Sequence, residues 1–196
     1  MEELLNQINQ WDQQLVLAAH DLGRPLLNDL MLGITEKYNW IPLYALLLYL
    51  LVRNYCLQAL YSVISVVLVI ILADHFTSSF MKPFFGRLRP CHDPAIGHLI
   101  VVLEKCGGQF GFASSHAANS FAVTSFFWYT FKKQYRWLPL LFIWPLVVSY
   151  SRMYLGVHYL TDISVGALVG WLIGYLVFRG TQWAARKYSF AFLTRN

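Results

Sequence analysis

Two histidines and one carboxylate have the types and spacing that nucleophilic or acid-base chemistry requires. His158 and Asp162 are four residues apart, so on a helix both side chains lie on one face and can form a hydrogen bond. A carboxylate that accepts from one imidazole nitrogen fixes the tautomer and leaves a lone pair on the other nitrogen, which makes a nucleophile. The alternative is a structural pair that ties a loop to a helix. His116 lacks a carboxylate at this spacing and is a candidate acid or base.

A short segment that precedes His116 in the chain carries three cations, Lys82, Arg87 and Arg89, followed by Pro90. Arginine offers a fork of donors that matches phosphoryl oxygens, and lysine supplies a compact point charge. The segment is therefore a candidate phosphate clamp. The alternative is that these side chains reach lipid headgroups from the end of a membrane helix.

Ser114 and Ser115 stand directly before an apolar run that begins at residue 117, where a helix is expected to start. The free amides and the positive dipole end of a helix start favour an anion. The pair is therefore a candidate phosphate cradle beside His116. Ordinary serine capping of the helix is the alternative.

The elements that position these residues are predicted to cross a membrane. The chain has 57% hydrophobic and 13% charged residues, which is too apolar for an ordinary water-soluble domain of 196 residues. A helix needs about 20 mostly apolar residues to cross a bilayer. We expect an all-α integral membrane protein, a bundle of about five transmembrane helices, or six. The five predicted spans are 39–53, 57–80, 117–131, 137–150 and 163–178.

The chain reads as one domain with a distinct N-terminal part. Residues 1–36 mix apolar side chains at helical spacing with Asn, Gln and acidic residues, which is typical of amphipathic helices that lie at the membrane interface. They lack the basic leader and uninterrupted apolar run of a cleaved signal peptide, so we expect them to remain in the mature protein. Residues 37–183 form the predicted bundle, and residues 184–196 form a tail.

The distribution of basic residues predicts the orientation. Arg53, Lys132, Lys133 and Arg136 share one side of the bundle, and with five spans the basic tail joins them. Lysine and arginine are enriched on the cytoplasmic side. The three polar segments then meet on the opposite face, where their cations, amides and histidines suit phosphoryl transfer.

The three segments resemble the signatures of the type 2 phosphatidic acid phosphatase superfamily. Residues 82–90 match K-x6-R-P, and residues 151–162 match S-R-x5-H-x3-D. The middle signature, P-S-G-H, is A-S-S-H at residues 113–116. The serine in place of glycine allows fewer backbone conformations, which affects the geometry of the cradle.

The resemblance implies a role for each residue of the site. His158 attacks phosphorus and forms a phosphohistidine, Asp162 orients it, and His116 protonates the leaving oxygen and then activates water. No metal and no cofactor are expected, because the cation cluster supplies the charge stabilisation. The phosphoryl oxygens are assigned to Lys82, Arg89, Ser114, Ser115 and Arg152.

The membrane spans favour a lipid substrate, because a headgroup-level site binds the phosphate while the hydrocarbon chain stays in the bilayer. Undecaprenyl diphosphate and phosphatidylglycerol phosphate rank above phosphatidate and phosphorylated lipid A. The expected partners are this lipid substrate and the bilayer, and no role for nucleic acid is expected. The expected location is the cell (inner) membrane, with the site facing the periplasm or exterior. The oligomeric state stays open.

Three alternative functions use the same fold. A lipid phosphotransferase passes the phosphohistidine to another acceptor, such as lipid A. A silent binding or scaffold protein would lack key polar side chains, all of which this chain retains. Haloperoxidase activity, found elsewhere in the superfamily, is the third.

The cysteines leave further alternatives. Cys91 and Cys106 both fall in the predicted outer loop, where they form a disulfide in an oxidising compartment, remain free thiols, or bind a metal with His92 and His98. Cys56 is expected to stay reduced at the opposite end.

Two features of the predicted spans concern packing. Asp74 and His75 lie in the second span, where Asp74 either balances the cation cluster or makes a packed polar contact. Gly166, Gly170 and Gly174 recur every four residues and give a smooth strip for close helix packing within the bundle.

Overall fold

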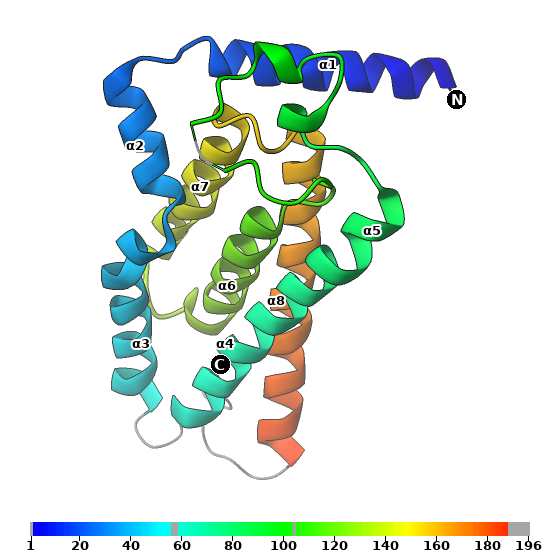
Figure 1. The fold of residues 1–196 in the computed structure, drawn as a ribbon. Helices are drawn as coiled ribbons and strands as arrows, with labels where there is room; N and C mark the ends of the chain where they lie inside the picture. The colour runs from blue at the N-terminus through cyan, green and yellow to red at the C-terminus, as the bar shows by residue number, and fades with distance from the viewer. Residues whose placement is uncertain (1, 56–58, 104, 188–196) are drawn as a thin grey trace.

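The computed structural model describes residues 2–55, 59–103 and 105–187, and these are mostly helical (Figure 1). The predicted all-α class is confirmed, because the described residues contain an isolated bridge between Leu88 and Phe110 but no strand. The α-helices are α1 (Glu2–His20), α2 (Pro25–Thr35), α3 (Ile41–Tyr55), α4 (Ala59–Asp74), α5 (Lys82–Phe85), α6 (Ser115–Phe131), α7 (Ile143–Tyr154) and α8 (Leu160–Lys187). Short 3-10 turns are η1 (Lys37–Trp40), η4 (Pro90–His92), η5 (Gly97–Leu99) and η6 (Leu138–Phe142).

Helices α6 and α8 form the centre of the bundle, and the glycine strip brings them together. A Cβ added at Gly170 would lie 2.1 Å from the Ala118 carbonyl oxygen, and one at Gly174 would lie 2.2 Å from that of Ala122. Both distances are far inside van der Waals contact, so only glycine fits. The strip packs within the bundle, as its spacing predicted.

Alanine at Gly170 is expected to lower the free energy of unfolding by about 2 kcal/mol, because the added methyl group would force the α6 and α8 backbones apart. Gly180 on the same helix is the matched control, since a Cβ there meets nothing within 4 Å. Gly180→Ala should instead raise stability slightly through helix propensity. Thermal unfolding in detergent measures both, and equal melting temperatures for the two variants would contradict the packing argument.

Helix α4 continues without a break through a π-helical segment, η3 (His75–Met81), into α5. The backbone N–H of Lys82 donates to the carbonyl of Thr77, five residues back, which is the hydrogen-bond pattern of a π-helix. Such segments are frequent at functional sites. Here the segment ends where the first predicted cation begins.

Two helices of the described chain are long and apolar enough to cross a membrane by length and composition, Ala59–Phe85 with 27 residues and Leu160–Lys187 with 28 residues. Helices also occupy the other three predicted spans, but α3, α6 and α7 have 15, 17 and 12 residues. At about 1.5 Å per residue these are shorter than a bilayer core of about 30 Å. A count of five spans therefore remains a prediction.

The N-terminal part contains two helices, as its pattern predicted. Helix α1 lies across the end of the bundle at the top of Figure 1 and exposes Leu4, Leu5 and Trp11. Its second half contacts the bundle through buried Asp12 and Val16. Its position at a membrane interface remains a prediction.

The loop between α5 and α6 is held by a disulfide between Cys91 and Cys106. Of the three alternatives for these cysteines, the structure has the disulfide. Both sulfur atoms are then in a covalent bond, although His92 lies close enough to complete a three-residue ligand group in the reduced form. Cys56 lies outside the described residues.

Candidate active site

The predicted pair of His158 and Asp162 lies at the junction of α7 and α8. His158 Nδ1 is 3.5 Å from Asp162 Oδ2, and the two residues are 1% and 0% exposed. Helix α8 begins at Leu160, and Asp162 Oδ2 accepts from the backbone N–H of Tyr159 at 3.0 Å, which caps the helix start. Asp162 therefore faces His158 and ties the loop to the helix at the same time.

The other imidazole nitrogen faces an arginine. Nη1 of Arg89 lies 3.3 Å from Nε2 of His158, and a guanidinium group donates hydrogen bonds but cannot accept them. Nε2 must therefore be the unprotonated nitrogen, and the ring proton lies on Nδ1, on the side of Asp162. This is the tautomer of a nitrogen nucleophile.

The protonation of His158 is set by its surroundings. Burial, followed by the charges of Arg89, Arg152 and Lys82, holds the pKa of His158 well below its ordinary value. The imidazole is therefore neutral at pH 7 and keeps its lone pair. The cations that act on the ring come from two segments, with Lys82 and Arg89 in one and Arg152 in the other.

Neutral oxygen atoms orient the three cations. Arg89 donates from Nε to the carbonyl of Gly108 at 2.7 Å, and Arg152 donates from Nη1 to the Thr35 hydroxyl at 2.5 Å. Lys82 Nζ donates to Ser115 Oγ at 2.8 Å. Contacts of this kind help to fix the position of each cation.

The two predicted phosphate-binding serines have structural contacts. Ser114 caps α6, because its Oγ accepts from the Ala117 amide at 3.5 Å, and its own N–H donates to the Asp162 carbonyl at 3.0 Å. Ser115 is 7% exposed and its Oγ contacts Thr77, Ser78 and Lys82. The capping alternative is therefore present for Ser114, Ser115 orients Lys82, and direct contact of either serine with phosphate remains a prediction.

The second histidine is accessible. His116 is exposed at the first turn of α6 and lines a cavity of about 310 Å³ that extends to Trp144 and Val148. It lies within electrostatic range of His158 and of the three cations. The site thus contains one buried imidazole and one imidazole that a leaving group or water can reach.

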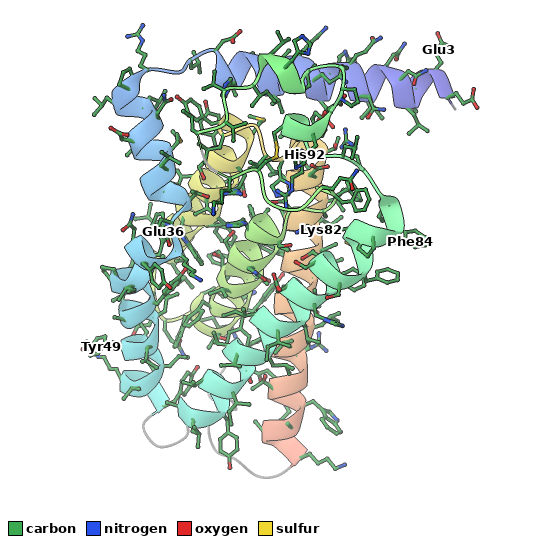
Figure 2. The ribbon with its side chains drawn as sticks, in the orientation of Figure 1. Glu3, Glu36, Tyr49, Lys82, Phe84 and His92 are labelled. Carbon is green, nitrogen blue, oxygen red and sulfur yellow. A yellow bond between two sulfur atoms is a disulfide. The ribbon has the colours of Figure 1, made fainter. Side chains whose placement is uncertain are left out.

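Asp74 lies at the end of α4 and lines the same cavity. Its Oδ1 accepts from Ser78 at 3.3 Å and Asn119 at 3.4 Å, and its charge acts on Lys82. Both alternatives for Asp74, a polar contact and a balancing charge, are therefore present. Lys82 lies on α5 and its side chain extends to Ser115, while the side chain of Phe84 points away from the bundle (Figure 2).

Arg87 has a different role from the other two cations of its segment. Its Nη1 donates to Asp162 Oδ1 at 3.0 Å, and its Nη2 donates to Asp12 Oδ2 at 2.7 Å. Asp12 also accepts from the N–H of Thr161 at 3.1 Å and from the Thr161 hydroxyl. A chain of contacts thus runs from helix α1 through Arg87 to the carboxylate that faces His158.

Sequence reasoning missed this chain of contacts. Arg87 stands between the two cations of its motif, where a phosphate ligand is the natural expectation. Asp12 lies on an amphipathic helix, where an acidic residue is expected to face water, yet it is 2% exposed. No spacing in the sequence connects the two residues.

Replacing Asp12 with asparagine is expected to lower kcat about tenfold with a smaller change in KM, because Arg87 would hold the Asp162 carboxylate less firmly. Asn9→Ala is the control, since Asn9 accepts from the same Arg87 Nη2 at 3.1 Å but is exposed. It should change kcat less than twofold. A melting temperature near that of the unmodified protein would show that Asp12→Asn lowers kcat without unfolding the protein. Equal kcat values for the two variants would contradict a positioning role for Asp12.

Gly111 lies against His158 and Asp162. A Cβ at this position would lie 3.0 Å from Asp162 Oδ2, 3.2 Å from Arg89 Cγ and 3.5 Å from His158 Nδ1. The backbone there approaches three candidate site residues at once, which leaves little room for a side chain. The sequence alone gave no reason to select this glycine.

Comparisons with known proteins identify the family of this chain. A family profile described as the PAP2 superfamily matches residues 58–186. The lipid A 4'-phosphatase of Bacteroides thetaiotaomicron is 38% identical over 182 residues, which cover 91% of this chain and 79% of that protein. The lipid A 4'-phosphatase of Porphyromonas gingivalis is 35% identical, covering 90% and 75%.

A solved structure shares the fold. The transmembrane PAP2 type phosphatidylglycerolphosphate phosphatase from Bacillus subtilis superposes with a TM-score of 0.67 at 24% identity, covering 88% of this chain and 85% of that one. The helical bundle is therefore a PAP2 membrane fold. Since the profile spans about two thirds of the chain and both named relatives cover most of it, the chain belongs to the PAP2 superfamily and is a lipid phosphatase.

Proposed function

We propose that this chain hydrolyses the terminal phosphate of a membrane lipid through a phosphohistidine at His158. The observation that carries the proposal is the placement of the His158 ring, with Nε2 facing Arg89 and Nδ1 facing Asp162. The neutral His158 ring lies between a carboxylate and a guanidinium. Its lone pair therefore points to the place where the cations would bind a phosphate. This arrangement suits nucleophilic attack on phosphorus.

The reaction runs in two steps. In the first, the Nε2 lone pair forms an N–P bond while the bond from phosphorus to the lipid oxygen breaks, and His116 gives its proton to that oxygen. In the second, water attacks phosphorus and gives a proton to His116, and the N–P bond breaks to release inorganic phosphate. His116 acts first as acid and then as base.

The charge that develops on the phosphoryl oxygens is stabilised by Lys82, Arg89 and Arg152. These cations stand where phosphoryl transferases of other classes place metal ions, and they are oriented before substrate binds. We therefore propose a reaction that needs no metal ion. Asp162 stabilises the proton on Nδ1 throughout, and Arg87 holds Asp162.

We place phosphorylated lipid A first among the substrates, since the relatives at 38% and 35% identity are lipid A 4'-phosphatases. This differs from the ranking that the motifs alone suggested. Phosphatidylglycerol phosphate remains a candidate through the Bacillus subtilis structure, and undecaprenyl diphosphate and phosphatidate complete the set. All four present a terminal phosphate at headgroup depth.

We infer that the site faces the exterior or periplasm from the cell (inner) membrane. The disulfide between Cys91 and Cys106 lies at the catalytic end, and disulfides persist in oxidising compartments. The opposite end carries Arg53, Lys132 and Lys133, which favours the cytoplasm for that end. Residues 184–187 end α8 there, and the rest of the predicted tail lies outside the described residues.

The proposal predicts phosphate release by the purified, detergent-solubilised protein from at least one lipid of this set, with undiminished rates in excess EDTA. Phosphorylated lipid A is expected to give the highest kcat/KM. A rate that collapses on chelation would overturn the metal-free mechanism. Product that forms only when a second acceptor lipid is added would identify a phosphotransferase instead.

A further inference from the structure

A basic pocket lies at the end of the bundle opposite the catalytic residues. It has a volume of about 430 Å³ and sits between the C-terminal ends of α6 and α8. Helix α8 reaches this end at the bottom of Figure 1. The cations that line it are Lys132, Lys133, Arg179 and Arg186.

Among the described residues, no carboxylate side chain lines this pocket. All ten Asp and Glu residues of the sequence fall outside the segments 37–73, 105–161 and 163–196. The cations are held by aromatic side chains instead, with Lys132 Nζ 4.9 Å from the Tyr129 ring centroid and Arg179 donating to the Tyr175 hydroxyl at 2.8 Å. Four positive charges around one cavity repel one another unless an anion enters.

The pocket arises from the shapes of the two helices. Gly166 to Gly174 keep α8 in backbone contact with α6, but beyond this strip Tyr129 and Phe178 stack with ring centroids 5.6 Å apart. Large rings hold the helices further apart than glycines do. The two helices therefore part toward this end, and α8 continues past the end of α6 at Phe131.

A buried polar group in the lining also requires a partner. Gln182 is 8% exposed, and its side-chain amide nitrogen has no hydrogen-bond acceptor among the described residues. A buried donor without a partner is destabilising, whereas a ligand oxygen in the pocket would satisfy it. This distinguishes the pocket from a scatter of surface lysines and arginines.

The depth of the pocket selects the kind of anion. Helix α8 has 28 residues and is about 42 Å long, so it extends beyond a hydrocarbon core of about 30 Å. With the catalytic end in one headgroup layer, the pocket falls in the other. Trp183 is 61% exposed beside it, as is typical of side chains at a membrane interface.

We propose that this pocket binds the phosphate group of an anionic phospholipid in the leaflet opposite the active site. Arg179 and Arg186 donate to the phosphate oxygens from α8, and Lys132 and Lys133 approach from the end of α6. The rings of Tyr129 and Phe178 contact the glycerol and the first acyl carbons. Basic pockets between transmembrane helices are known to select anionic headgroups in this way.

The test is lipid retention by the full-length protein, measured by native mass spectrometry after exchange into neutral detergent with added phosphatidylglycerol or phosphatidylcholine. Arg179→Gln combined with Arg186→Gln should weaken phosphatidylglycerol binding about tenfold or more and leave phosphatidylcholine unchanged. The matched control is Arg53→Gln with Arg136→Gln, which removes two exposed charges from the same end outside the pocket. This control should change binding less than twofold.

Two further binding measurements test what the pocket binds. Gln182→Leu keeps the charge and the approximate size of the residue, and it should weaken phosphatidylglycerol binding in the same direction as the double variant. Equal losses in the pocket and control variants would overturn the proposal in favour of a diffuse surface charge. Inorganic phosphate that displaces phosphatidylglycerol at low millimolar concentration would overturn the assignment to a lipid.

Discussion

Replacement of His158 by alanine is expected to lower kcat by at least about ten-thousandfold, since the variant loses the proposed nucleophile. Binding should persist, because Lys82, Arg89 and Arg152 remain. A large fall in kcat with substrate affinity retained would indicate loss of the nucleophile, whereas a loss of affinity would indicate damage to the anion site. Melting temperature provides the check on folding, since the ring is fully buried.

His116→Ala gives the complementary result. Water then lacks its base, so a phosphoenzyme should accumulate when the substrate has a good leaving group that needs no protonation. When the reaction with a substrate radiolabelled in its phosphate is stopped, the protein should carry the label. This label should be stable in alkali and lost in acid, as expected of a phosphohistidine. A label that also forms in His158→Ala would place the nucleophile elsewhere.

Gly111→Ala is expected to lower kcat about tenfold or more, although the residue carries no reactive group. Its methyl group would meet Asp162 Oδ2 at 3.0 Å and Arg89 Cγ at 3.2 Å, so these groups beside His158 must give by a few tenths of an ångström. A misplacement of about 1 Å can cost about a hundredfold in rate, and a shift of a few tenths costs correspondingly less. Steady-state kinetics on the lipid that turns over fastest gives the measurement.

Gly108→Ala is the matched control for this loop. A Cβ at Gly108 meets nothing within 4 Å, and its carbonyl still accepts from Arg89 Nε. Its kcat should stay within about twofold of the unmodified protein. Similar losses in the two variants would show that the loop tolerates no substitution at all, and would remove the argument from close approach.

Much of this site could be predicted from the sequence because each part is local. Lys82 and Arg89 follow a membrane helix, Ser114 precedes one, and His158 and Asp162 are one helical turn apart. Two predicted spans, 117–131 and 137–150, lie between the second and third segments and return the chain to the same face. The structure brings these residues together as expected.

The contacts that were missed join elements far apart in the chain. Arg87 and Asp12 are separated by 75 positions and connect a loop to a surface helix, and neither position differs in residue type from an ordinary solvated charge. The hydroxyl of Ser115 contacts Thr77 and Ser78 of the neighbouring helix, which the sequence did not indicate, and its contact with phosphate remains a prediction. Such outcomes depend on how helices rotate against each other, which periodicity does not specify.

The π-helical segment His75–Met81 determines how the helix before Lys82 responds to a change in its number of residues. A π-helical turn holds an extra residue, so the loss of one residue there returns the helix to the α-helical path with Lys82 on nearly the same face. The loss of one residue from the regular turns of α4 would instead turn Lys82 by about 100° about the helix axis. Lys82 Nζ would then no longer reach Ser115. Among related chains, a change of spacing within α4 therefore matters as much as the loss of the lysine itself.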